Sequence, residues 1–178
     1  SSEIVYGNYK NALEDDKVNP SGQYSIWKIA GEEIVKEYSR ATGQDHVIIR
    51  PGLVYGERDI TNRLIGQFFQ RAIADDTLYV NGKDSTSDFT YVGDAALGIV
   101  LASITKNVTG TFNISRGKKE KILDVAETIV KLVGKGKVKI RAKNKNAMSK
   151  RILDCSKAEE EFKFKPTTNF EEGLKLYY

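Results

Sequence analysis

The sequence predicts an α/β fold, in which helices and the strands of a parallel sheet alternate along the chain. Apolar residues recur every three or four positions in several segments, as they do along one side of an amphipathic helix. Short runs rich in Val, Ile, Thr and aromatic residues stand between these segments. The run Val47-Ile48-Ile49, between two helical patterns, is typical of a strand buried on both faces of a parallel sheet.

Helices are expected at residues 24–40, 62–74, 94–104, 122–133, 156–162 and 170–176. The first has one apolar stripe, made of Ile26, Trp27, Ala30, Ile34 and Tyr38. Ser21 or Gly22 is expected to open this helix and Gly43 to close it. Asp94 is a candidate N-cap for the third.

Strands are expected at residues 46–50, 78–80, 89–92, 111–114 and 138–141. A dinucleotide-binding fold also needs a glycine-rich turn between a strand and a helix, and no G-x-G-x-x-G motif occurs in the 178 residues. Gly134-Lys135-Gly136 follows a helical pattern, which predicts a helix C-cap and a turn.

The composition is that of an ordinary globular protein, with 40% hydrophobic and 29% charged residues. The sequence has no apolar run of about 18 residues, the length that would predict a membrane-spanning helix. Cys155 is the single cysteine, so an internal disulfide is excluded and a reducing cytoplasm is the expected location. With His46 as the single histidine, the sequence also argues against a structural zinc site.

The net charge of +4 is concentrated in residues 135–151, which contain eight Lys and Arg residues and no acidic one. One interpretation is a phosphate-binding patch for nucleic acid or a nucleotide diphosphate. The other, which we favour, is an edge strand whose lysines keep it unpaired and soluble. No aromatic residue is interleaved for base stacking, which argues against binding of single-stranded nucleic acid.

The first candidate for chemistry is the pair Tyr24 and Lys28, in a Tyr-x-x-x-Lys spacing. Positions four apart share a face of a helix, so the phenol and the ammonium are expected side by side. A neighbouring positive charge favours phenolate over phenol, which makes Tyr24 a candidate general base or acid for a sugar hydroxyl or ketone.

The spacing by itself also fits an ordinary surface Tyr–Lys pair, because Tyr6 and Lys10, and Tyr79 and Lys83, share it. Those two tyrosines stand beside turn residues, whereas Tyr24 begins a long amphipathic helix.

Ser2 is the second candidate, because its hydroxyl could reach the same substrate oxygen as the tyrosine. The alternative is an ordinary turn serine.

Six segments, in order and with suitable gaps, resemble the extended short-chain dehydrogenase/reductase family, the NAD(P)-dependent nucleotide-sugar epimerases and dehydratases. They are Ser2-Glu3-Ile4-Val5-Tyr6-Gly7, Tyr24-Ser25-Ile26-Trp27-Lys28, Arg50-Pro51-Gly52-Leu53-Val54-Tyr55-Gly56, Asp88-Phe89-Thr90-Tyr91-Val92-Gly93-Asp94, Gly110-Thr111-Phe112-Asn113-Ile114, and Asp154-Cys155-Ser156-Lys157-Ala158 followed by Phe164-Lys165-Pro166. The resemblance covers essentially the whole chain.

The resemblance implies a role for each matching residue. Ser2 would hydrogen-bond the reacting hydroxyl, Tyr24 would exchange its proton, and Lys28 would hold the nicotinamide ribose. Pro51 and Gly52 would border the nicotinamide ring of NAD or NADP. The cofactor carries the hydride chemistry, while the protein positions and protonates the substrate.

Departures from the family pattern bear on the substrate. Glu3 and Ile4 stand where sugar dehydratases have an Asp-Glu pair, so dehydration is not expected. Leu53 and Ser87 occupy substrate-binding positions where an Asn and a phosphate-binding Arg are common. Arg58, Lys83 or the basic stretch are possible replacements for that Arg.

The resemblance also implies a domain organisation. Residues 1–56 would complete a Rossmann-like doubly wound parallel sheet. Residues 57–178 would form mainly a small α/β substrate-binding domain, with residues 88–104 returning to the first. We expect the cofactor-binding half to lie in a longer gene product or a partner chain. Family members often form homodimers through the helix that carries Tyr24, where Trp27 would lie.

The function expected is that of a nucleotide-sugar epimerase. The alternatives are a ketoreductase of the same fold and a non-catalytic substrate-binding or basic interaction module.

Overall fold

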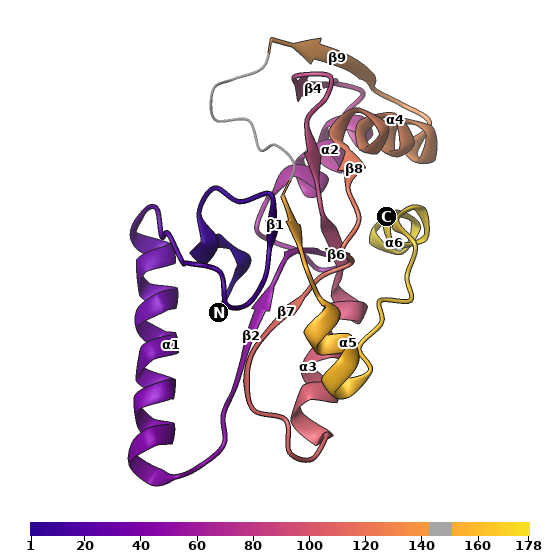
Figure 1. The fold of residues 1–178 in the computed structure, drawn as a ribbon. Coiled ribbons are helices and arrows are strands. Elements are labelled where there is room, and N and C mark those ends of the chain that lie inside the picture. The colour runs from indigo at the N-terminus through magenta and orange to yellow at the C-terminus, as the bar shows by residue number, and fades with distance from the viewer. Residues whose placement is uncertain (143–150) are drawn as a thin grey trace.

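The computed structural model describes residues 1–142 and 151–178, and its elements alternate as predicted (Figure 1). The helices are the 3₁₀ helix η1 (Glu3–Tyr6) and α1 (Gln23–Thr42), α2 (Leu64–Ile73), α3 (Val92–Ile104), α4 (Ile122–Val133), α5 (Ser156–Phe162) and α6 (Phe170–Tyr177). The strands are β1 (Asn11–Ala12), β2 (Val47–Pro51), β3 (Leu53–Tyr55), β4 (Thr77–Asn81), β5 (Thr86–Ser87), β6 (Phe89–Tyr91), β7 (Gly110–Ile114), β8 (Glu120–Lys121), β9 (Lys137–Arg141) and β10 (Ile152–Leu153).

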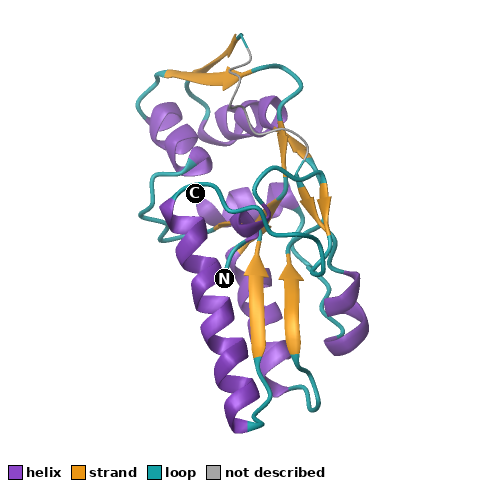
Figure 2. Cartoon of the chain, turned by 60° about the vertical axis from the view of Figure 1, so that its left-hand side comes forward, coloured by secondary structure: helices purple, strands orange, loops and turns teal. Residues whose placement is uncertain are grey.

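The strand pairing confirms the α/β class. β2 pairs with β7, β3 with β6, β4 with β9 and β1 with β10, all in parallel, and β5 pairs with β8 in the antiparallel sense. Parallel neighbours need a crossover connection, and the intervening helices supply it. Figure 2 shows parallel strands running alongside the long helix α1.

Three apolar clusters hold these elements together. The largest lies between α2 and α4 and beneath β4 and β6, with Phe68, Leu78 and Ile129 among its members. A second joins α3 and α5 to β7 around Phe112. The smallest joins η1, β1 and β10 through Val5, Ala12 and Leu153. The predicted division at residue 56 into two domains stays a prediction.

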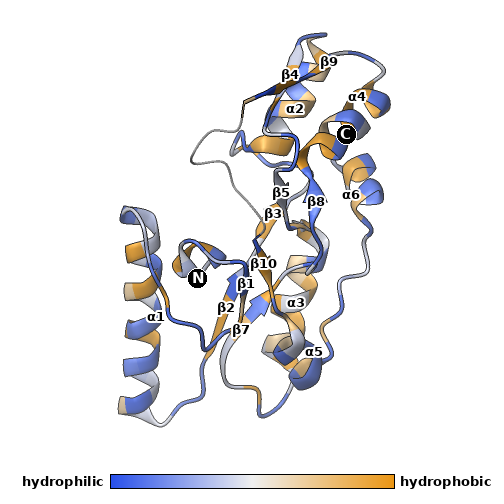
Figure 3. Cartoon of the chain, turned by 45° about the horizontal axis from the view of Figure 1, so that its top comes forward, coloured by the Kyte–Doolittle hydropathy of each residue, from blue (hydrophilic) through white to orange (hydrophobic). Residues whose placement is uncertain are grey.

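The apolar stripe of α1 does not face the core of the described chain. Trp27 is 67% exposed, Ile34 69% and Tyr38 61%. The buried side chains of this helix are Ser25 and Glu32. Figure 3 shows α1 standing apart, with hydrophobic and hydrophilic residues both present along it. Amphipathic spacing therefore located the helix correctly, but the face it buries here is the polar one.

The helix ends agree with the sequence in most places. Gly22 and Gly43 are the caps of α1, with Gly43 in the left-handed conformation at φ 70°. Gly134 is the C-cap of α4, also left-handed.

The prediction for Asp94 is wrong. α3 begins at Val92 with Tyr91 at the N-cap, so Asp94 lies inside the first turn. Its carboxylate instead accepts hydrogen bonds from the backbone N–H groups of Thr167 and Thr168, in the loop before α6.

Two strand predictions need a correction or an addition. Val47 is 36% exposed, so β2 is not buried on both faces within the described chain. β9 carries Lys137, Lys139 and Arg141 and pairs, among the described strands, with β4 alone, which favours the edge-strand interpretation of the basic stretch. Lys143, Lys145 and Lys150 of that stretch lie outside the described residues.

None of the described helices has the length and apolarity that a membrane crossing requires.

Candidate functional site

A cavity of about 500 Å³ opens between η1, the start of α1 and the β2–β3 junction. Five of the seven residues predicted for the site line it, namely Ser2, Tyr24, Gly52, Leu53 and Ser87. These residues come from positions far apart in the sequence, so the fold brings them together. The other two, Lys28 and Pro51, lie next to lining residues without being among them.

Ser2 both caps a helix and lines the cavity. It is the N-cap of η1, and its hydroxyl oxygen accepts a hydrogen bond of 3.4 Å from the backbone N–H of Ile4. It also lines the cavity. The cap fixes where the serine side chain stands, because the extended Ser2 backbone turns directly into the 3₁₀ helix.

Tyr24 is the second residue of α1 and is 53% exposed at the cavity. The ammonium of Lys28, one helical turn later, lies 5.2 Å from the centre of the Tyr24 ring. The two are therefore neighbours, as the four-residue spacing predicted.

The other Tyr-x-x-x-Lys pairs are used differently. The Tyr6 hydroxyl is buried and donates to the Asn113 side chain over 2.7 Å. Tyr79 lies in β4, with the Arg141 guanidinium 3.3 Å from its ring centre.

Gly52 forms part of the cavity wall directly after β2. Its N–H donates to the carbonyl of Ile114 over 2.9 Å, which extends the β2–β7 pairing by one residue. An added Cβ would come within 3.0 Å of the Ser115 Cβ, so a larger residue at position 52 would press on the segment that follows β7. Pro51 is the last residue of β2 and is half-buried.

Two uncharged residues line the cavity at the positions where the family pattern has polar or charged ones. Leu53 is the first residue of β3 and is half-buried. Ser87 is the last residue of β5 and is almost completely buried.

Two arginines also line the cavity, Arg63 and Arg151. Arg151 is the last residue of the basic stretch, so part of that stretch does reach the site; its guanidinium lies 5.6 Å from the centre of the Tyr9 ring. Arg58 and Lys83 are not among the described lining residues. Arg63 was missed, and its only signal was its place at the start of a predicted helix, where it is the N-cap of α2.

Glu3 also lines this cavity, and it is 5% exposed. Burial raises the pKa of Glu3, although a hydrogen bond from the Tyr9 hydroxyl, 3.0 Å long, opposes the shift. The Asp-Glu pair of the dehydratases is absent at Glu3 and Ile4, and the structure adds that Glu3 is a buried residue at the cavity wall. Within residues 1–142 and 151–178 no three His, Cys, Asp or Glu side chains gather as a metal site would require.

Comparison with known proteins places this architecture in a family. The sequence profile of the NAD dependent epimerase/dehydratase family matches residues 1–115. The chain is 32% identical over 182 residues to a putative UDP-glucose 4-epimerase of Methanocaldococcus jannaschii, covering 98% of this chain and 59% of that protein. It is 29% identical to an uncharacterised UDP-glucose epimerase of Bacillus subtilis, covering 98% and 56% of the two chains.

Solved structures agree. The UDP-glucuronic acid 4-epimerase of Bacillus cereus, in complex with UDP-glucuronic acid and NAD, superposes with a TM-score of 0.89 at 29% identity, over 100% of this chain and 58% of that one. The UDP-glucose 4-epimerase of Thermotoga maritima with UDP-glucose gives 0.85 at 25% identity, over 99% and 60%.

These matches confirm the Rossmann-like α/β architecture that the sequence predicted. The chain spans between 56% and 60% of the length of these relatives. Because the family profile matches well over half of the chain, this protein belongs to the NAD-dependent epimerase/dehydratase family of enzymes.

Proposed function

We propose that this chain carries the acid–base centre and the substrate pocket of an NAD(P)-dependent nucleotide-sugar epimerase. The observation that carries the proposal is that Ser2 and Tyr24 line one cavity while the Lys28 ammonium lies against the Tyr24 ring. The relatives named as UDP-sugar epimerases support it, since they match almost the whole chain.

In this proposal Tyr24 exchanges a proton with a sugar hydroxyl. Its phenol stands at the cavity surface, where a general acid or base could reach a bound sugar, and the Lys28 ammonium lies 5.2 Å from the centre of its ring. The Ser2 hydroxyl can donate to the same sugar oxygen, because the cap of η1 uses it only as an acceptor.

The residues present fit the nicotinamide end of the cofactor. The Lys28 ammonium and the Tyr24 hydroxyl are donors suited to ribose hydroxyls, and the backbone at Pro51 and Gly52 offers a wall with little side chain for a flat ring. When bound, NAD would accept a hydride from the sugar carbon and return it.

The substrate is proposed to be a nucleotide diphosphate sugar. Leu53 and Ser87 give the cavity uncharged walls, and Arg63 and Arg151 are the candidate cations for the diphosphate. Guanidinium groups bind phosphate through paired, charge-assisted hydrogen bonds. The homodimer and the cytoplasmic location stay predictions; the exposed stripe of α1 is the surface that such a dimer would use.

The test is product analysis with the complete gene product, NAD and either UDP-glucose or UDP-glucuronic acid. We expect a product of equal mass, separated by chromatography, with no net change in NADH absorbance. Steady consumption of NADH with a 4-keto sugar nucleotide would instead identify a ketoreductase. A product lighter by one water would identify a dehydratase and give Glu3 a chemical role. Binding of either sugar nucleotide without any turnover would contradict the enzymatic proposal and leave a substrate-binding module.

A further inference from the structure

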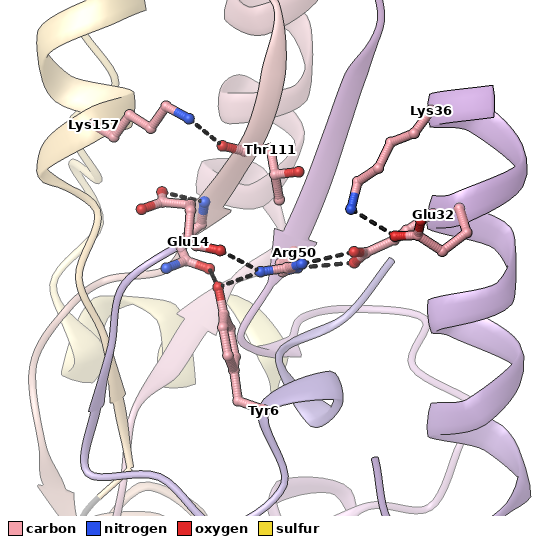
Figure 4. A network of polar contacts seen from close by, with 9 residues as sticks. Tyr6, Glu14, Glu32, Lys36, Arg50, Thr111 and Lys157 are labelled. Atoms are coloured by element: carbon pink, nitrogen blue, oxygen red, sulfur yellow. Dashed lines mark hydrogen bonds and ion pairs between the residues drawn. The ribbon is translucent and has the colours of Figure 1, made fainter. Parts of the chain in front are cut away.

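A single guanidinium joins the two elements that carry Ser2 and Tyr24. Arg50, in β2, donates through Nε and Nη2 to the two carboxylate oxygens of Glu32 in α1, over 2.8 and 2.6 Å (Figure 4). Its Nη1 donates to the hydroxyl of Tyr6 in η1, over 2.9 Å. Ser2 caps η1 and Tyr24 lies in the first turn of α1. Arg50 therefore contacts both the helix that Ser2 caps and the helix that carries Tyr24.

The Arg50–Glu32 pair is buried and well supplied with partners. The Arg50 and Glu32 side chains are 4% and 2% exposed. Nη1 also donates to the carbonyl of Glu14 over 2.9 Å. Burial by itself would raise the pKa of Glu32, but the hydrogen bonds and charge of Arg50, together with smaller contributions from Ser1 and Lys36, hold the pKa below its usual value. The carboxylate is therefore ionised at neutral pH, and the forked pair fixes orientation as well as distance.

Apart from the ion pair, α1 is attached to η1 through Ile29, which is half-buried and packs against the cluster of Val5, Tyr6, Ala12 and Leu153. The other buried side chain of this helix, Ser25, donates its hydroxyl proton to the carbonyl of Gly22 at the helix's own N-terminus, so this bond does not reach the sheet. Tyr24, Lys28 and Glu32 follow one another at four-residue spacing and lie along one side of the helix. A shift at Glu32 is therefore carried along α1 to Tyr24.

From these contacts we infer that Arg50 and Glu32 are positioning residues for the acid–base centre: their ion pair sets the distance between the hydroxyls of Ser2 and Tyr24 across the cavity. The inference rests on the proposed function, because it takes Ser2 and Tyr24 as the acid–base centre. It assigns no contact with substrate to Arg50 or Glu32. It also explains why a buried ion pair, which is costly to desolvate, is placed at this point of the fold.

The test is Glu32→Asp in the complete gene product, which keeps the charge and withdraws the carboxylate by one methylene. A misplacement of about 1 Å can cost about 100-fold in rate. We expect kcat to fall by about 10- to 100-fold while KM for the sugar nucleotide stays within about threefold. Rates are corrected for the folded fraction, measured by circular dichroism at the assay temperature. Glu33→Gln is the matched control, since Glu33 is the next residue of α1 and pairs with Lys36 at the surface over 2.8 Å.

A double-mutant cycle separates positioning from stability. If Glu32 acts through Tyr24, Glu32→Asp has little further effect on kcat in a Tyr24→Phe background. Hydrogen exchange over α1 is expected to be faster in Glu32→Asp than in Glu33→Gln. Wild-type kcat in folded Glu32→Asp, with Tyr24→Phe inactive, would overturn the positioning role alone. Full turnover by Tyr24→Phe would overturn the proposed function, and the positioning role with it.

Discussion

The hydroxyl of Tyr9 donates a hydrogen bond of 3.0 Å to the carboxylate of Glu3, at the wall of the cavity that Ser2 and Tyr24 also line. Burial of the carboxyl is the larger effect, and it raises the pKa of Glu3 above the ordinary 4.5. The folded protein therefore carries an acid whose ionised form is disfavoured by its surroundings, beside the candidate catalytic residues.

This raised pKa makes Glu3 a source of pH-dependent stability. Because the folded-state value lies above the unfolded one, the contribution of Glu3 is fully present below about pH 4.5 and is lost as pH rises through the folded-state pKa. Glu3→Gln keeps an acceptor for the Tyr9 hydroxyl and removes the ionisation. We expect the variant to gain stability relative to wild type between pH 4.5 and pH 7, measured by urea unfolding. A difference independent of pH over this range would contradict the account.

Arg151 is expected to contribute to substrate binding. Loss of a charge-assisted hydrogen bond costs about 1.5–3 kcal/mol, so Arg151→Met should raise KM for UDP-glucose or UDP-glucuronic acid by about 10- to 100-fold, with kcat within about threefold. The control is Arg40→Met, at the exposed end of α1, where the arginine pairs with Glu37. An unchanged KM in Arg151→Met would remove this residue from the substrate site.

Two helical glycines predict opposite effects on stability. Gly98 in α3 is buried, and an added Cβ would come within 2.9 Å of the Ile114 side chain and 3.1 Å of the Phe164 ring. Overpacking of this kind costs about 1–3 kcal/mol, so Gly98→Ala should lower the free energy of unfolding. Gly31 in α1 has no atom within 4 Å of its added Cβ among the described residues, and Gly31→Ala should raise it by about 1 kcal/mol. Chemical denaturation of both variants checks the pair, and equal signs would contradict the packing described here.

Much of the fold could be predicted from local patterns. α4 and α5 occupy the predicted residues, because a sharp apolar period and Gly134 mark the first, and Ser156 opens the second. Among the short strands, β6 was predicted from its aromatic and Thr residues, whereas β1, β3, β5, β8 and β10 were not, since segments of two or three residues have no period to detect.

Contacts between residues that are distant in the sequence could not be predicted either. The apolar residues of α1 gave its helical spacing but not the direction in which that face points, which depends on what packs against it. Arg50 and Glu32 are far apart in sequence, and no local pattern indicated that they pair.

The candidate site was predicted from an ordered set of motifs rather than from any one of them. Tyr24 and Lys28 could be separated from the two other Tyr-x-x-x-Lys pairs by their helix, and the structure places Tyr24 alone of the three tyrosines at the cavity. Arg63 could not be predicted, because a charged residue at a helix start has many ordinary explanations and the cavity forms only when α2 and β3 meet.

The most direct test of the account is the turnover of Tyr24→Phe beside Tyr38→Phe, in the complete gene product with NAD and the sugar nucleotide it converts. Both changes remove one phenol oxygen from an exposed tyrosine of α1. Of the two tyrosines, only Tyr24 lines the cavity. A positioned acid or base contributes about 10²–10⁴-fold, so we expect kcat of Tyr24→Phe to fall at least about 100-fold while Tyr38→Phe keeps the wild-type rate. Turnover by Tyr24→Phe within about tenfold of wild type would contradict the central claim.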